Sequence, residues 1–220
     1  MMDNQMNETE IAQYLAQNPD FFTAHTELLA TMYLPNPHGS GTVSLAERQQ
    51  VAQRDKIRQI ERKYNELLQF GIENDATSNK VHKLTLALLQ ANDLTSTAQA
   101  LNDSLQNDFN VSFVNLKLWA SASNTEDTNH DAFNSIDESV KSWAETLAEP
   151  YCGSAPTDEI AQIFGEEAKS YAITTLGEGE VKGLLMMASD DEKRFYPEMG
   201  TMFIKRIGEL ATAATQQYLA

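Results

Sequence analysis

The sequence predicts an α+β protein in which a helical, coiled-coil-like N-terminal region precedes a domain built on an antiparallel sheet with flanking helices. Three observations predict this class. The stretch from Ser44 to about Gln90 contains no proline and one glycine, Gly71, so one long helix is expected there. Segments with the alternating or continuous apolar pattern of strands begin only after that stretch. An apolar repeat from Phe203 to Ala214 then indicates a closing helix.

The first predicted elements are two short helices. Asn7 begins a capping box and predicts a helix over residues 8–17, and Asn18 followed by Pro19 predicts the start of a second helix. The second helix carries four large apolar side chains: Phe21, Phe22, Leu28 and Leu29. Two short helices cannot form a core of their own. We therefore expect these residues to pack on the long helix, in the same chain or in a dimer mate, or to dock on another protein.

The long helix carries a seam of apolar residues. After the turn-rich stretch 35–41, Ser44 begins a second capping box, and the helix would extend about 65–70 Å. Four apolar residues follow each other at three- and four-residue spacing: Ile57, Ile60, Tyr64 and Leu67. The seam weakens at Gly71 and resumes at Val81. Because such a seam needs a partner, we expect a homodimer, with residues 1–90 as the dimerisation region and either parallel or antiparallel pairing.

Residues 91–220 are expected to form the second domain. Their patterns predict a helix that starts at Asp93 or Thr95 and runs to about Asn107, a helix capped by Thr157 that ends at Gly165, and helices over 136–148 and 197–219. They also predict strands over 111–119, 151–153, 170–176 and 181–189. Gly177 to Glu180 reads GEGE, which is a hairpin signal between the last two strands. The last helix is expected beside the long helix.

The charge of the chain limits its partners. The formal net charge is −16. Residues 47–63, with six basic and three acidic residues, are the one stretch with a marked net positive charge. An acidic surface repels phosphate backbones and anionic lipid, so direct nucleic-acid binding and a membrane partner are not expected. The sequence has no apolar run of about 20 residues and no secretory signal at its start. With one cysteine, Cys152, it also has no intramolecular disulfide, and we expect a cytoplasmic protein.

The sequence does not contain the residue patterns of a catalytic or metal centre. The paired acidic residues lie in loops or at helix starts, where solvent and the helix dipole stabilise their negative charges, so their presence does not indicate a catalytic site. The four histidines lack the spacing of metal ligands: His25, His38, His82 and His130. No glycine-rich phosphate loop is present. We therefore expect no enzyme, no metal and no cofactor, with Cys152 as the one candidate nucleophile.

Two stretches together resemble a known family. They are IAQYLAQNPDFFTAHTELL with LPNPHGSGTVSLAERQ, in residues 11–49, and YCG, IFG and GLLMMASDDEKRF, in residues 151–211. They are similar to the bacterial DUF484 family of uncharacterised proteins. The resemblance implies a helical N-terminal region and a C-terminal GAF-like domain, and no established activity. The expected strand SYAITTL, residues 170–176, departs from the pattern that the resemblance leads us to expect there, which is a small residue followed by an apolar run and a proline.

The resemblance also implies a partner and a pocket. Family members are often encoded beside a tyrosine recombinase, which makes that enzyme a candidate protein partner by association only. A GAF-like sheet usually forms one wall of a ligand pocket, for which six residues are candidates: Trp119, Phe133, Trp143, Tyr151, Cys152 and Phe164. The alternative is that they fill the core.

The sequence therefore favours a non-catalytic cytoplasmic sensor or adaptor that acts as a homodimer, binds a small molecule and signals through a protein partner. The expected dimer or bundle interface contains the following residues: Phe21, Phe22, Leu28, Leu29, Ile57, Ile60, Tyr64, Leu67, Phe203, Ile207 and Leu210. Two alternatives stay open. One is a small-molecule enzyme that uses Cys152, and the other is a structural dimer with a filled, vestigial pocket.

Overall fold

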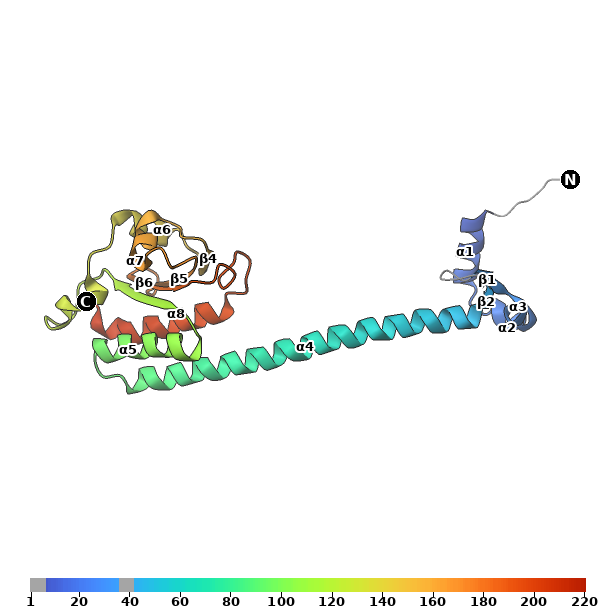
Figure 1. Ribbon diagram of the computed structural model, residues 1–220, viewed down its shortest axis with the longest axis horizontal. Helices are drawn as coiled ribbons and strands as arrows, with labels where there is room; N and C mark the ends of the chain where they lie inside the picture. The colour runs from blue at the N-terminus through green and yellow to red at the C-terminus, as the bar shows by residue number, and fades with distance from the viewer. Residues whose placement is uncertain (1–6, 36–41) are drawn as a thin grey trace. The chain divides into compact units, whose positions relative to one another are not determined.

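The computed structural model describes residues 7–35 and 42–220 (Figure 1). The chain divides into two compact units, Met1–Phe70 and Gly71–Ala220. The helix α4 (Leu45–Gln90) crosses this division. Its last twenty residues belong to the second unit, because Leu84 is fully buried in the core of that unit. The division therefore lies within the long helix rather than after it.

The first unit consists of short elements followed by the first part of α4. They are α1 (Glu8–Gln17), α2 (Phe21–Ala24), α3 (Thr26–Thr31), β1 (Tyr33–Pro35) and β2 (Thr42–Ser44). The predicted capping box of α1 is present: Asn7 Oδ1 accepts from Thr9 N, and Asn7 N donates to Glu10 Oε2 at 3.1 Å. The strands β1 and β2 pair in antiparallel fashion, with Leu34 opposite Val43.

The second predicted helix is broken in the structure. Asn18 ends α1 instead of starting α2, because both its backbone N and its Nδ2 donate to Tyr14 O. The helix then breaks at His25, whose φ of −120° and ψ of 51° are not helical, and Thr26 Oγ1 donates to Thr23 O beside the break. The predicted turn residues 36–41, including His38, lie outside the described residues.

The apolar residues of the first unit find little cover within one chain. No residue of α1 or α2 is buried, and Ile11 and Leu28 are exposed. Phe21 instead makes ring contacts with Tyr14, Phe22 and His25, at centroid distances of 6.1, 5.3 and 4.5 Å. The side chain of Leu29 lies outside what the structure describes. One chain therefore leaves this aromatic cluster half-exposed.

The second unit is built on one antiparallel sheet. Its strands are β3 (Phe113–Leu118), β4 (Tyr151–Gly153), β5 (Ser170–Leu176) and β6 (Gly183–Ser189), in the order β3-β6-β5-β4. Its helices are α5 (Leu94–Asp103), which continues into the π-helical turn η1 (Ser104–Asp108), α6 (Glu138–Glu145), α7 (Asp158–Phe164) and α8 (Met202–Thr215). Three short 3₁₀ turns complete the unit: η2 (Asp127–Asn129), η3 (Asp131–Phe133) and η4 (Gln216–Tyr218). The predicted fold class, a helical region followed by a sheet with flanking helices, is confirmed.

The two faces of the sheet carry separate cores. The helices α5 and α8 cover one face and α6 and α7 cover the other, as Figure 1 shows. Leu185 and Met187 of β6 join the α5–α8 core, together with Leu84 of α4. Leu184 and Met186, one step along the same strand, join the α6–α7 core. All seven residues of β6 are buried, as expected of a central strand with helices on both faces.

The last helix differs from its predicted bounds. It begins at Met202 rather than at Pro197, because Glu198 has a φ of 72° and Met199 N donates to Tyr196 O in a turn. The helix packs closely on the sheet, since a Cβ built on Gly208 would lie 2.5 Å from Thr174 Oγ1. The sequence predicts the long helix as the neighbour of α8. The helix packs mainly on β5 and α5, and it meets α4 at a cavity that Thr77 and Phe203 line.

Candidate functional site

The predicted pocket residues lie on both faces of the sheet and do not come together. Trp119, Trp143, Tyr151 and Phe164 pack against the α6–α7 core. Phe133 and Cys152 pack against the α5–α8 core. Because side chains alternate along a strand, the adjacent residues Tyr151 and Cys152 of β4 must point to opposite faces.

The aromatic residues on the α6–α7 face are packed against each other. The ring centroids of Trp143 and Tyr151 are 5.5 Å apart, and those of Phe164 and Tyr171 are 5.8 Å apart, both edge to face. The polar ends are satisfied as well, since Trp119 Nε1 donates to Val181 O and Tyr151 OH donates to Ser154 O, each at 2.9 Å. This geometry supports the interpretation in which they fill the core.

Cys152 is half-buried in the α5–α8 core. Burial raises the pKa of its thiol to about 11. Because the thiolate is the nucleophile, a thiol with a raised pKa reacts poorly at neutral pH. The environment of Cys152 therefore disfavours the hypothesis of a cysteine enzyme.

A cavity of about 430 Å³ lies where α4, η1 and α8 meet in the second unit. Two charged residues, Glu73 and Arg194, line it, but its walls are otherwise largely apolar and include Leu105, Phe109, Val111, Met199, Phe203 and Ile207. Thr77 of α4 also lines it, and Arg194 Nη2 donates to Phe109 O at 2.6 Å beside it. Its volume and its apolar walls are those of a small-molecule site. Sequence patterns missed this cavity because its walls come from segments that are distant along the chain.

The structure places the predicted interface residues of α8 in different surroundings. Ile207 is buried in the core of its own unit, and Phe203 and Leu210 are half-buried. Ile207 is therefore not available as an interface residue, because its own chain covers it. Part of the apolar surface of α4 after Gly71 is covered in the same way, since Val81, Leu84 and Leu88 pack on the second unit. Ile72, Leu86 and Leu89 on the same stretch are exposed.

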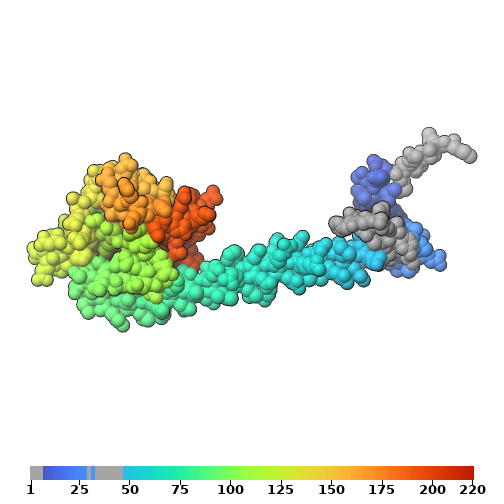
Figure 2. Space-filling model, in the orientation of Figure 1, coloured from blue at the N-terminus to red at the C-terminus, as the bar shows by residue number. Residues whose placement is uncertain are grey.

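The apolar seam of α4 before Gly71 is exposed. Ile57, Ile60, Tyr64 and Leu67 are between 54% and 68% exposed, and the cyan part of α4 is uncovered on the face in view in Figure 2. An exposed apolar strip of this length on a helix is typical of an interaction surface. We call these four residues the α4 seam.

Within residues 7–35 and 42–220, no three His, Cys, Asp or Glu side chains are grouped so as to hold a metal ion. No helix in this part of the chain is long and apolar enough to cross a membrane.

Comparisons with known proteins give a family. The model of a family described as a protein of unknown function, DUF484, matches residues 1–219. No curated protein matches the chain. Among solved structures, the chain is similar to the native GAF domain of the potassium sensor histidine kinase KdpD from Escherichia coli. That similarity covers 64% of this chain and 93% of the other, at 14% identity and a TM-score of 0.41. Because the family model spans nearly every residue, the chain belongs to the DUF484 family.

Proposed function

We propose that the protein is a cytoplasmic, non-catalytic sensor or adaptor that works as a homodimer and passes its signal to a protein partner. One observation carries the proposal: α4 has an exposed apolar seam and also forms part of the wall of an apolar cavity. The seam supports pairing with a second copy, and Thr77 supports contact between α4 and a ligand in the cavity. If α4 can pack in two ways in the dimer, a ligand that binds more tightly to one of these arrangements would increase the population of that arrangement.

Charges beside the α4 seam support a parallel homodimer. With Ile57, Ile60, Tyr64 and Leu67 at the a and d positions of heptads, Lys56 occupies a g position and Glu61 the following e position. In a parallel pair these two positions face each other across the seam, so Lys56 meets Glu61 of the second copy. An antiparallel pair would bring g positions together, and both g positions of this stretch, Lys56 and Lys63, are cationic.

The ligand that fits the cavity is a small, mainly apolar molecule. Phe109, Phe203 and Met199 offer aromatic and sulfur surfaces, and the hydroxyl of Thr77 already donates to Glu73 O at 2.8 Å. Apolar contact with the ligand would therefore supply most of the affinity.

Native mass spectrometry of the full chain tests the proposal, first at low salt and then after mild denaturation. We expect a dimer that carries a small-molecule mass, which disappears on denaturation. A monomer at every concentration would refute the homodimer. A dimer without an added mass would refute the sensor and leave the structural dimer with a filled pocket.

A matched pair of variants locates the ligand. Thr77→Met extends an apolar side chain into the cavity, and we expect it to abolish the added mass while the dimer stays. Thr85→Met is the control, because Thr85 lies on the same helix and makes the same bond, from its hydroxyl to Val81 O at 2.9 Å, away from the cavity. Equal loss in both variants would mean that the ligand is not in this cavity.

A further inference from the structure

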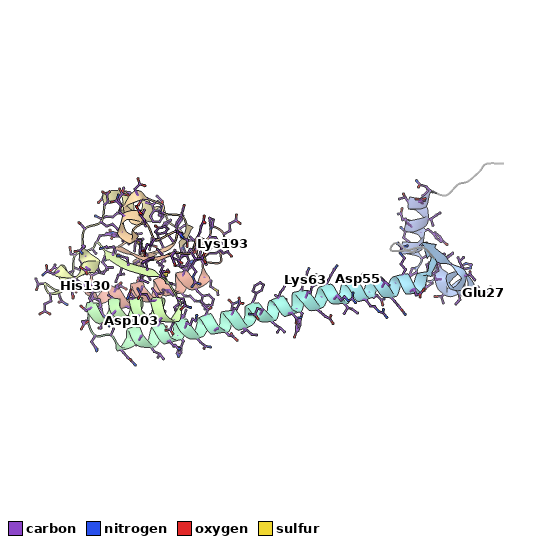
Figure 3. The ribbon with its side chains drawn as sticks, viewed as in Figure 1. Glu27, Asp55, Lys63, Asp103, His130 and Lys193 are labelled. Atoms are coloured by element: carbon purple, nitrogen blue, oxygen red, sulfur yellow. The ribbon has the colours of Figure 1, made fainter. Side chains whose placement is uncertain are left out.

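The part of α4 that belongs to the second unit carries a second line of exposed apolar side chains. Ile72, Leu86 and Leu89 are between 47% and 77% exposed. The opposite side of the same stretch is covered, because Val81 and Leu84 pack in the α5–α8 core. In Figure 3 the side of this stretch that faces away from α5, where Asp103 is labelled, carries side chains with no described element beyond them.

Helix geometry places the exposed residues on one strip. Successive residues of an α-helix are rotated by about 100° around its axis. Leu86 therefore lies within about 20° of Asn79 and about 40° of Ile72, and about 60° from Leu89. It lies about 160° from the buried Leu84. We call Ile72, Asn79, Leu86 and Leu89, all of them exposed, the outer strip.

The α4 seam cannot continue past Gly71 in its own heptad frame. Counted from Ile57 at an a position, that frame assigns d positions to Val81 and Leu88. Both residues pack on their own second unit, so they are not available to a second copy. The other a and d positions after the seam are glycine or polar: Gly71, Asn74, Ser78 and Thr85. A second copy that pairs along the seam therefore needs a different face of α4 in the second unit.

A frame advanced by one residue gives the pattern of a parallel two-stranded coiled coil. In this shifted frame Ile72 and Asn79 occupy a positions and Leu89 occupies a d position. A β-branched residue at a and leucine at d favour two parallel strands, and an asparagine at a fixes the register and the number of strands. Counted along the chain, Leu68 is a further d position and directly follows Leu67, the last residue of the α4 seam.

Polar residues make the contact through the shifted frame weak on its own. Asp75 and His82 are exposed and occupy d positions, where polar side chains lower the stability of a coiled coil. The flanking positions allow close approach, because Gly71, Ala76 and Ser78 are small. Such a contact forms between chains that the α4 seam already holds together, since tethering raises their effective concentration.

We infer that the second units of a homodimer contact each other through the outer strip, with Asn79 opposite Asn79 of the second copy. This inference rests on the homodimer of the proposed function and adds an interface whose frame is offset by one residue from that of the α4 seam. The helix α4 then lies between the cavity and the second copy, because Thr77 lines the cavity and lies about 160° from Asn79. A ligand that moves α4 would therefore act on this contact.

Disulfide formation in single-cysteine additions to the full chain tests the inference. In a parallel pair, identical residues at an a position lie close enough to be bridged. Asn79→Cys and Leu86→Cys place the thiol at a positions of the shifted frame. Ser78→Cys and Thr85→Cys are the matched controls, because each lies one residue earlier, at an a position of the unshifted frame. We expect linked dimers to form at least about tenfold faster in the first two variants.

Tyr64→Cys separates failure of this inference from failure of the proposed function, because Tyr64 is an a position of the α4 seam. Linkage through residue 64 without linkage in the two shifted-frame variants overturns the inference and leaves the homodimer. Faster linkage in the two control variants also overturns it, because the frame would then be unshifted. No linkage in any variant refutes the parallel homodimer, and the inference with it. The unaltered chain, with Cys152 alone, measures the background.

Replacement of Asn79 gives a second measurement, by sedimentation equilibrium of the full chain. An asparagine at an a position costs stability, so we expect Asn79→Val to lower the dissociation constant of the dimer at least about tenfold. Ser78→Val is the matched control, because it adds the same side chain beside the outer strip, and we expect a change of less than about threefold. An unchanged dissociation constant in Asn79→Val overturns the inference.

Discussion

Cys152 shows how burial decides the chemistry of a single side chain. Its pKa of about 11 leaves a thiolate fraction at pH 7 that is more than about 100-fold below that of an ordinary cysteine. We expect alkylation by iodoacetamide at pH 7 to be slower than that of free cysteine by at least this factor, and to rise steeply above pH 9. Mass spectrometry of the intact chain measures the rate. Rapid labelling at pH 7 without denaturant would restore the hypothesis of a cysteine enzyme.

Leu84 and Leu86 lie two residues apart on α4 in opposite environments. Leu84 is fully buried and Leu86 is 47% exposed. We expect Leu84→Ala to lower the free energy of unfolding by about 2–5 kcal/mol, because it leaves a cavity in the α5–α8 core. Leu86→Ala should change it by less than about 0.5 kcal/mol. Urea denaturation followed by circular dichroism compares the two. Similar losses would mean that α4 does not pack on the second unit through Leu84.

The candidate pocket residues show what the sequence alone can predict about sites. The burial of Cys152 and the packing of the aromatic residues agree with interpretations made from residue type. The assignment of Phe133 and Cys152 to the face opposite Trp143 depends on strand register, which no local pattern contains.

The orientation of paired α4 helices can be tested through the charges beside the seam. We expect Lys56→Glu to weaken the dimer about tenfold, because it replaces attraction by repulsion at two symmetric positions of a parallel pair. Combining it with Glu61→Lys should restore the affinity. Sedimentation equilibrium measures both. Arg62→Glu is the control, because it makes the same change of charge at an f position, which faces away from the seam. An antiparallel pair predicts no rescue.

The elements themselves were predictable where their signals are local. Asn7 and Thr157 each cap the helix that the sequence assigns to them, and Asp93, one of two candidate starts, caps α5. In all three helices a side-chain oxygen accepts from a backbone N–H group of the first turn. Two of the errors, at Asn18 and Pro197, concern residues that also favour helix starts. At Asn18 the end of α1 competes for the same side chain, and after Pro197 the backbone of Glu198 is left-handed. The packing between elements decides where each of these helices starts and ends, and the local sequence pattern contains no information about that packing.

The division of the molecule into two units predicts that the second keeps its stability without the start of the chain. We expect deletion of residues 1–40 to leave its melting temperature within about 2 °C, because no residue of α1 or α2 is buried. We also expect the dissociation constant of the dimer to rise at least tenfold. Phe21 and Phe22 are half-exposed in one chain and would be buried against the paired helices of a dimer. Calorimetry and sedimentation measure the two effects.

The two results of the deletion are separable. An unchanged dimer would show that the aromatic cluster around Phe21 docks on something other than a second copy. A large fall in melting temperature would show that α1 and α2 pack on the second unit. The full chain at matched concentration is the control, because dimer stability depends on mass action.

The complete burial of β6 has a consequence for molecules that are not yet folded. A nascent or partly unfolded chain exposes GLLMMAS, an uncharged apolar segment of the kind that assembles into cross-β aggregates. Acidic residues stand close to both of its ends: Glu178, Glu180, Asp190, Asp191 and Glu192. Such flanking charges act as gatekeepers, and a net charge of −16 keeps exposed chains apart. Near the isoelectric point of about 4.5 this repulsion vanishes, and chains caught unfolded there would precipitate rather than refold.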